Sequence, residues 1–206
     1  MAPELLAFDG WIAGAAFASG DRFVVGRWPR SPFGSFADVM WARPGGERVL
    51  LASDERALAF IRRHYTFEEH RATPVDVRVS PRRIRVSAAQ VELDLDLEQP
   101  GALSRLLALR PRRLRTLRTW VAIEDRLARP LVAPLLGGGA GIRARGRTRG
   151  GSREWYAIHA FRLARARAAI GGVDLGGTVP ARACGFGFSE FPPMPAAVRV
   201  TSLIEA

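Results

Sequence analysis

Lysine is absent from this 206-residue sequence, so all 31 basic residues are arginine. A chain without lysine has no lysine Schiff base, no phosphate-loop lysine and no kinase ion-pair lysine. Asparagine is absent as well. Lysine and asparagine both have AT-rich codons, so their joint absence indicates GC-rich coding DNA. Codon bias explains why the cations are arginine, but it does not explain where they lie.

Cysteine and long apolar runs are also scarce. The single cysteine, Cys184, excludes an internal disulfide and any zinc site with several cysteines. No apolar run reaches the length of about 18 residues that a transmembrane helix needs. The first twenty residues lack a basic start and include Glu4 and Asp9, so we expect no signal peptide. These absences predict a cytoplasmic protein.

Acidic residues are scarce in only one segment. Residues 1–100 hold 13 arginines and 14 acids, for a net charge of −1, and residues 155–206 have a net charge of +2. Residues 101–154 hold 13 arginines but only Glu124, Asp125 and Glu154, for a net charge of +10. Three uses of this segment remain open: an anionic partner or ligand, an anionic membrane surface, or a solvated face that keeps the protein soluble.

Strand signals dominate the first hundred residues. Turn residues at 19–21 and 44–46 separate two pairs of short runs, 11–17 with 22–28 and 37–42 with 48–52, which indicates two hairpins. Apolar residues then recur at every second position in three further runs. They are Val75, Val77 and Val79; Ile84, Val86 and Ala88; and Val91, Leu93, Leu95 and Leu97. The predicted fold is mainly β, an antiparallel barrel or strongly curved sheet with inserted short helices.

Helical spacing interrupts this pattern in two places. Ser53, Asp54 and Glu55 can cap a helix over 54–64. The segment 101–140 predicts an arginine-rich helical insertion, with one helix over 103–109 and a second over 111–125. Strands are expected again over 141–148, 155–167, 185–191 and 198–204. No linker is evident, so we expect one domain over 1–206.

The candidate ligand site lies on one predicted strand and the basic segment before it. If 153–161 is a regular strand, Arg153, Trp155, His159 and Phe161 face one side, and Glu154, Tyr156 and Ile158 face the other. In a barrel, Trp155, His159 and Phe161 would form an apolar wall with one titratable group. Arg143, Arg145 and Arg147 alternate just before it and would hold an anionic head group.

The other groups of polar and aromatic residues do not require a functional site. Glu92, Asp94, Asp96 and Glu98 share a strand face opposite arginines, which predicts a solvated charge ladder. His64 and His70 lack the spacing of a known metal motif, so we predict no metal site. No nucleophile elbow is present, and neither a cofactor nor a catalytic residue is assigned. Glycine and aromatic residues mix over 28–36 and 185–193, which fits either core packing or a pocket mouth.

Three stretches carry a resemblance: Gly10-Trp11-Ile12-Ala13-Gly14, the run 28–34 (Trp-Pro-Arg-Ser-Pro-Phe-Gly) and Arg153-Glu154-Trp155-Tyr156. With them, most of the chain resembles a family of uncharacterised proteins from high-GC bacteria, and this resemblance implies no activity. The predicted architecture is similar to lipocalin-type (calycin) barrels. The early Gly-x-Trp of lipocalins is not matched, because Gly10 directly precedes Trp11.

The leading hypothesis is therefore non-enzymatic binding of a small amphipathic or anionic molecule in a β-barrel pocket. The alternative is binding of nucleic acid or an anionic surface through 101–154, for which affinity must fall steeply with salt. An enzyme is the third hypothesis. It would use His159 as an acid or base together with Glu154 or Tyr156. Because His159 faces the opposite side of a regular strand, the side chains of the two faces would have to come into contact.

Overall fold

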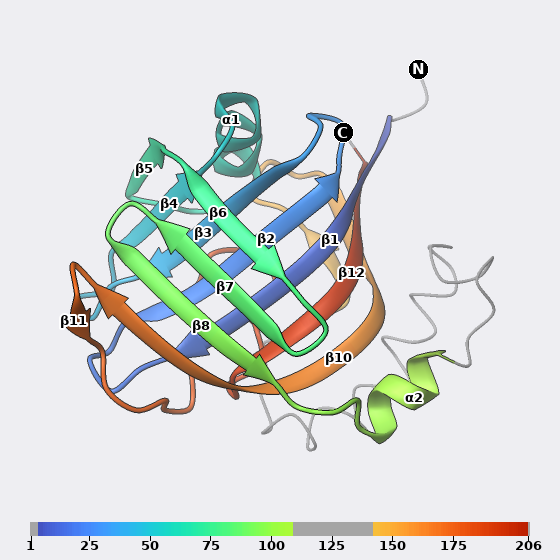
Figure 1. Cartoon of the computed structure of the whole chain (residues 1–206). Coiled ribbons are helices and arrows are strands. Elements are labelled where there is room, and N and C mark those ends of the chain that lie inside the picture. Colours follow the sequence, from blue (N-terminus) through green and yellow to red (C-terminus); the bar gives the residue numbers. More distant parts are fainter. Residues whose placement is uncertain (1–3, 109–141, 206) are drawn as a thin grey trace.

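The computed structural model describes residues 4–108 and 142–205, and its fold is a strongly curled antiparallel sheet that forms a half-barrel (Figure 1). Within these residues ten strands follow one another in the order β5-β4-β3-β2-β1-β12-β10-β8-β7-β6, and β9 and β11 pair with β10. The strands are β1 Leu5–Ala16, β2 Arg22–Arg30, β3 Phe36–Ala42, β4 Arg48–Ala52, β5 Glu69–Ala72, β6 Val75–Val79, β7 Arg83–Ala88, β8 Val91–Leu97, β9 Arg145–Arg147, β10 Arg153–Ile170, β11 Val173–Asp174 and β12 Ala196–Glu205. The predicted mainly β class is confirmed.

Turn chemistry sets the first two hairpins where the sequence predicts them. Gly20, between β1 and β2, has a φ of +94°, a left-handed conformation that glycine adopts without steric cost. Ser19 donates a 2.7 Å hydrogen bond to Asp21 beside it. Gly46, between β3 and β4, has a φ of +97°. The three period-two runs form β6, β7 and β8, which pair as an antiparallel meander.

Helix α1 (Glu55–His64) begins and ends with ordinary capping chemistry. The Asp54 carboxylate accepts a 2.9 Å hydrogen bond from the Ala57 N–H and so satisfies one free donor of the first turn. Arg62, Arg63 and His64 occupy the last turn, where positive charge is favourable. The helix packs beside β4 and β5. The second described helix, α2 (Ala102–Ala108), packs on β10.

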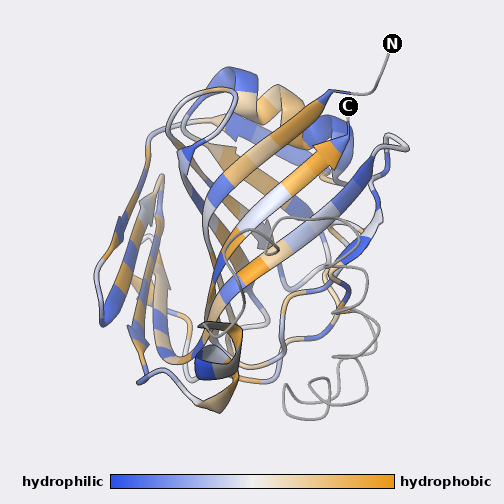
Figure 2. Cartoon of the chain, turned by 90° about the vertical axis from the view of Figure 1, so that its right-hand side faces the viewer, coloured by the Kyte–Doolittle hydropathy of each residue, from blue (hydrophilic) through white to orange (hydrophobic). Residues whose placement is uncertain are grey.

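One apolar cluster fills the inside of the half-barrel. Strands β6–β8 fold over β1–β4 as a second layer, and Figure 2 shows these two layers from the side. The side chains between them are mainly aliphatic, and Val39 and Leu95 are fully buried. The described interior is thus a packed core, as in other small barrels that are filled by their own side chains.

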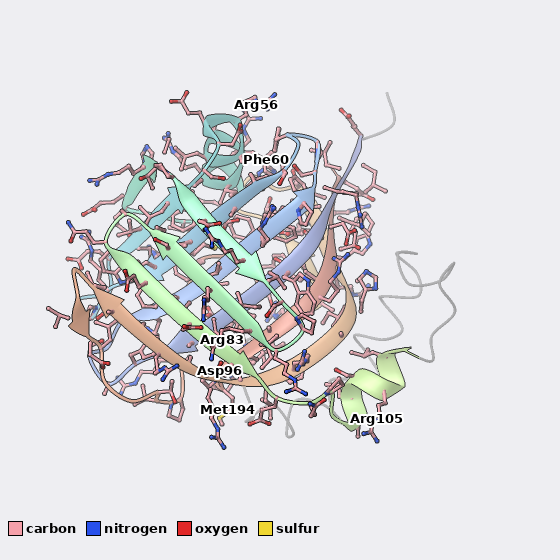
Figure 3. All side chains as sticks on the ribbon, in the orientation of Figure 1. Arg56, Phe60, Arg83, Asp96, Arg105 and Met194 are labelled. Carbon is pink, nitrogen blue, oxygen red and sulfur yellow. The ribbon has the colours of Figure 1, made fainter. Side chains whose placement is uncertain are left out.

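A second apolar cluster covers the opposite face of the same sheet and is rich in aromatic rings. Helix α1 packs on this face through Leu58 and Ile61, and Phe60 extends from the helix (Figure 3). Of the eleven phenylalanines, only Phe17 and Phe23 belong to the inner cluster. The other nine lie in this second cluster or stack on its members: Phe8, Phe33, Phe36, Phe60, Phe67, Phe161, Phe186, Phe188 and Phe191.

Two expected elements differ from the structure, and a third lies mostly outside the described residues. Residues 185–191 form an irregular loop and not a strand, because Gly185 has a φ of +66° and the Glu190 carboxylate accepts the N–H groups of Cys184 and Gly185. The strand expected over 141–148 is reduced to β9, and most of the expected insertion, with its second helix over 111–125, lies outside the described residues. Within those residues, neither helix has the length and apolarity to cross a membrane.

Candidate functional site

The predicted ligand-binding row on β10 is divided by a β-bulge. The register with β12 shifts between Ile158 and Ala160, so His159 is the extra residue. An extra residue reverses the alternation of the side chains beyond it. Trp155 therefore packs with Ala157 and Leu203, whereas Phe161 packs in the aromatic cluster on the other face, with Tyr156. The structure does not bring Trp155 and Phe161 together as one wall.

His159 joins a polar group on the Trp155 face. Its Nε2 lies 2.8 Å from the Thr201 hydroxyl, and that hydroxyl is 3.5 Å from an Asp9 oxygen. Asp9 also pairs with Arg30 and Arg199, whose hydrogen bonds hold the pKa of Asp9 below its ordinary value against the opposing effect of burial. Thr201 lies opposite Ala157, on the face away from Tyr156 and Glu154. The acid–base pairing of His159 with either residue is therefore not formed.

The predicted anion-binding arginines lie along β9 and just before it. Arg147 is paired with Arg153 and Arg145 with Trp155, so these side chains share the Trp155 face. Arg143, Arg145 and Arg147 are all exposed, and the Arg147 guanidinium donates a 2.9 Å hydrogen bond to the Gly151 carbonyl. Arg145 and Arg147 therefore lie next to Trp155, on the opposite face from Phe161, and Arg143 lies just before β9.

A different group of residues forms the most distinctive buried polar site of the described chain. Glu154 is 1% exposed, and its Oε1 accepts hydrogen bonds from the Tyr65 hydroxyl at 2.6 Å and the Ser202 hydroxyl at 2.9 Å. The Tyr156 hydroxyl lies 3.1 Å from that of Tyr65. Glu154 Oε2 is buried without a hydrogen-bond partner among the described residues. We call Glu154, Tyr65, Tyr156 and Ser202 the Glu154 cluster.

Three separate elements, β10, β12 and the end of α1, place these side chains. Glu154 and Tyr156 are two residues apart on β10 and so share a face, and Ser202 lies directly opposite Tyr156 on β12. Tyr65 is the residue that ends α1, where its N–H donates to the Ile61 carbonyl. The end of the helix therefore sets the position of the tyrosine over the sheet.

Burial dominates the electrostatics of the Glu154 cluster. Desolvation raises the pKa of Glu154 above its ordinary value, although hydrogen bonds from Tyr65, Ser202 and Tyr156 oppose the shift. Burial also raises the pKa of Tyr65 and of Tyr156 well above the usual tyrosine value, and the neighbouring Glu154 carboxylate adds to both shifts. Both tyrosines therefore remain hydrogen-bond donors, and Glu154 holds a proton at higher pH than an exposed glutamate.

The loop 184–191 covers the cluster with aromatic rings. The Phe188 ring stacks on Tyr156 with the ring centroids 5.5 Å apart. Two glycines allow this close fit. A Cβ on Gly187 would lie 2.6 Å from the Tyr65 ring, and one on Gly146 would overlap the Phe188 ring. Cys184 begins the loop, and burial raises the pKa of its thiol to about 11, so the thiol is inert at neutral pH.

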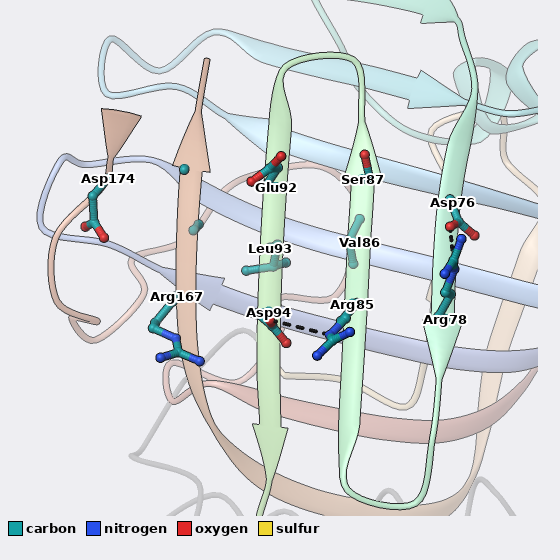
Figure 4. A pocket seen from close by; sticks show the side chains of 12 residues that line it. Asp76, Arg78, Arg85, Val86, Ser87, Glu92, Leu93, Asp94, Arg167 and Asp174 are labelled. Atoms are coloured by element: carbon teal, nitrogen blue, oxygen red, sulfur yellow. Dashed lines mark hydrogen bonds and ion pairs between the residues drawn. The ribbon is translucent and has the colours of Figure 1, made fainter. Parts of the chain in front are cut away.

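Two open hollows lie elsewhere on the described surface. One, of about 580 Å³, lies over β6–β8 and β10 (Figure 4). Its walls include Arg85 with Asp94 at 3.7 Å, an ion pair between neighbouring strands that confirms the predicted charge ladder, and Arg78 with Asp76 at 2.7 Å within β6. The other, of about 520 Å³, lies at the open end of the half-barrel beside Trp41. No three His, Cys, Asp or Glu side chains of the described segments are grouped for a metal ion.

Comparison with known proteins finds likeness only at the level of solved structures. No family model and no curated protein matches this sequence. An acetoacetate decarboxylase from Legionella pneumophila subsp. pneumophila aligns over 98% of this chain and 84% of its own, with 8% identity and a TM-score of 0.48. Another structure, from structural studies of acetoacetate decarboxylase, aligns over 98% and 87%, with 8% identity and a TM-score of 0.49. Likeness at this level assigns no ligand or reaction.

Sequence reasoning identified half of the Glu154 cluster and missed the other half. Glu154 and Tyr156 lie on the predicted strand, on the face opposite the predicted ligand-binding residues. Tyr65 belonged to a segment considered only for metal binding, and it is 89 residues from Glu154. Ser202 is 48 residues from Glu154. The closest signal for the cluster is the glutamate itself, since an acid within a mostly apolar strand requires polar partners when it is buried.

Proposed function

We propose that this protein binds a small amphipathic acid at the Glu154 cluster, with its acidic head at Glu154 and its apolar body among the neighbouring aromatic side chains. The observation that carries the proposal is the buried Glu154 Oε2, which has no partner among the described residues. An unsatisfied buried polar atom costs about 1–3 kcal/mol. A ligand oxygen that accepts a hydrogen bond from protonated Glu154 would remove this cost.

The surroundings of the cluster support an amphipathic ligand. Ile158, Phe161, Phe67 and Phe191 are only partly buried, although they pack against the same aromatic cluster. Apolar area that remains accessible beside convergent polar groups is typical of small-molecule sites. The loop 184–191 lies over this region through the stacking of Phe188 on Tyr156, and its displacement would admit a ligand without unfolding the sheet.

Octanoic, lauric and retinoic acids, with the matching alcohols, test the proposal in thermal unfolding experiments. At a ligand concentration of about 100 times the dissociation constant, the stabilisation is about 2.7 kcal/mol. That corresponds to a rise of roughly 5 to 10 °C in melting temperature for a chain of this size. The acids should give a larger shift in melting temperature than the alcohols below the raised pKa of Glu154. They should lose it as pH rises through that pKa, because only protonated Glu154 donates a hydrogen bond to a carboxylate.

Glu154→Gln is the matched variant. The glutamine amide keeps a neutral donor at every pH, so this variant should bind the acids with little pH dependence. Native mass spectrometry of protein purified from its host gives a second measurement, because a bound acid would add its own mass. The proposal is wrong if no acid shifts the melting temperature and no ligand copurifies. It is also wrong if Glu154→Gln keeps the pH dependence of the wild type.

Acid–base catalysis is the alternative that the raised pKa of Glu154 favours, since perturbed carboxyl groups are frequent among general acids. Tyr65, hydrogen-bonded to both Glu154 and Tyr156, would extend the proton path. Because the chain has no lysine, such a reaction proceeds without a lysine Schiff base. Turnover that is abolished in Glu154→Gln, while binding of the same acid is retained, would establish catalysis.

A further inference from the structure

Five exposed arginines gather around the turn between β9 and β10 without an ion pair to any described carboxylate. They are Arg62, Arg63, Arg143, Arg147 and Arg149. Arg145 and Arg153 extend the same surface, and Glu205 lies 3.6 Å from Arg153 as its carboxylate partner. We call these seven residues the β9 arginine surface. The surface combines residues of α1 with residues of 143–153, which are about 80 positions later in the sequence. Its charge density therefore arises from the fold as well as from the arginine content of one segment.

The end of α1 and the β9–β10 turn are in direct contact. The Arg149 N–H donates a 3.0 Å hydrogen bond to the His64 carbonyl, and Thr148 and Gly151 close the turn beside it. The Arg63 carbonyl lies 3.2 Å from where a Cβ on Gly150 would stand. The turn that follows β9 therefore lies against the last residues of α1, which include Arg62 and Arg63.

The outer face of β6–β8 provides a contrast within the same molecule. There, Arg78, Arg83, Arg85 and Arg167 each have a carboxylate within ion-pair distance, in the charge ladder. Figure 3 marks Arg83 and Asp96 on that face. A surface that only maintains solubility can carry such a balanced set of charges. The β9 arginine surface instead includes five cations that form no ion pair with a carboxylate of the described residues, which favours an external anion as their partner.

We infer that the β9 arginine surface binds the phosphodiester backbone of a nucleic acid. Arg145 and Arg147 are alternate residues of β9, about 7 Å apart along the strand, so they add two separate charges to those of the turn and of the end of α1. A set of separate cations fits a polymer that repeats one negative charge per unit better than it fits a single small acid. Guanidinium groups also bind phosphate oxygens through two parallel hydrogen bonds.

The composition of the surface argues against a lipid bilayer as the partner. Peripheral helices and loops bind membranes by inserting large apolar side chains next to their cations. The exposed large apolar residues of the described chain are Leu5, Val79, Leu163, Val173, Val179 and Met194, and none of them lies in β9, in the β9–β10 turn or in α1. We therefore expect contacts to the backbone and little preference for base sequence.

Fluorescence anisotropy with labelled homopolymeric DNA of about 20 nucleotides tests this inference on the full chain. The triple variant R143Q/R147Q/R149Q should raise the dissociation constant at least tenfold at about 50 mM salt. Each lost phosphate contact on a single strand removes about 0.7 from the slope of log affinity against log salt, so three should reduce the slope by about 2. Oligonucleotides of different base composition should bind with similar affinity.

The control is R71Q/R82Q/R165Q, which removes three exposed arginines that lie outside the surface and form no ion pair with a described carboxylate. It changes the net charge equally, and we expect less than a threefold effect. Equal weakening by both triples would show that net charge alone drives binding and would overturn the inference. A salt-independent affinity would overturn it, as would binding to phosphatidylserine vesicles with no binding to DNA.

Discussion

Asp38→Asn is expected to raise the free energy of unfolding at pH 8 by about 4 kcal/mol. Asp38 is 2% exposed and accepts one hydrogen bond from the Trp28 indole at 2.8 Å. Burial raises the pKa of its carboxyl from 3.8 to about 7, with the Trp28 hydrogen bond opposing the shift. A shift of about three pKa units corresponds to about 4 kcal/mol.

The direction of this effect follows from proton linkage. The folded protein holds the Asp38 proton up to about pH 7, whereas the unfolded chain releases it near pH 4. Folding is therefore favoured by protonation below pH 4, and this contribution is lost as pH rises through 7. Asparagine is neutral at every pH, and its oxygen can still accept from Trp28. The variant should lose less stability than the wild type between pH 4 and pH 8.

Urea unfolding at pH 4 and pH 8 measures the prediction. Burial also raises the pKa of Glu154 and adds its own pH dependence to both proteins, so the difference between variant and wild type is the informative quantity. That difference should be under about 1 kcal/mol at pH 4 and near its full value at pH 8. A difference that is the same at both pH values would show that Asp38 is ionised in the folded protein.

Gly10→Ala is expected to lower the free energy of unfolding by about 3 kcal/mol or more. Gly10 lies in β1 where the register with β2 is irregular, between Asp9 and Trp11. A Cβ at this position would overlap the backbone carbonyl of Arg27 and lie 3.0 Å from the Trp28 ring. Because a carbonyl in a paired strand cannot rotate away, the two strands would have to separate.

Gly177→Ala is the matched control, since a Cβ there meets no atom within 4 Å and the glycine has no positive φ. It should change stability by less than about 0.5 kcal/mol. Urea midpoints and m-values for both variants separate a loss of stability from a change in the unfolded state. Similar small losses in both variants would show that β1 and β2 are not in close contact at Gly10.

Local patterns were sufficient to predict the class of fold. Alternation in β6–β8 depends only on neighbouring residues, and so do the turns at Gly20 and Gly46 and the cap at Asp54. Each of these features has a cause within a few residues of the chain. The alternation of aromatic residues over 185–191 wrongly predicted a strand. The Glu190 carboxylate accepts hydrogen bonds from backbone N–H groups that would otherwise pair with a neighbouring strand.

The candidate site was less predictable, because it depends on contacts between distant segments. Nothing in Ile158-His159-Ala160 marks a bulge, since none of the three is a glycine and the run continues a strand pattern. The bulge still decides that Phe161 joins Tyr156 and leaves Trp155. Likewise, the meeting of Tyr65 with Glu154 requires α1 to end directly above β10, and no spacing within either segment shows this.

The place of β12 in the middle of the sheet has a consequence for folding during synthesis. Strands β1–β4 lie on one side of it and β10 with β8–β6 on the other, and Asp9 and Thr201 are 192 residues apart in the chain. Until β12 leaves the ribosome, β1 and β10 each present an unpaired edge. Such edges promote association with other chains, and closing so long a loop slows folding. The nascent protein therefore consists of two separate half-sheets that a single late strand joins.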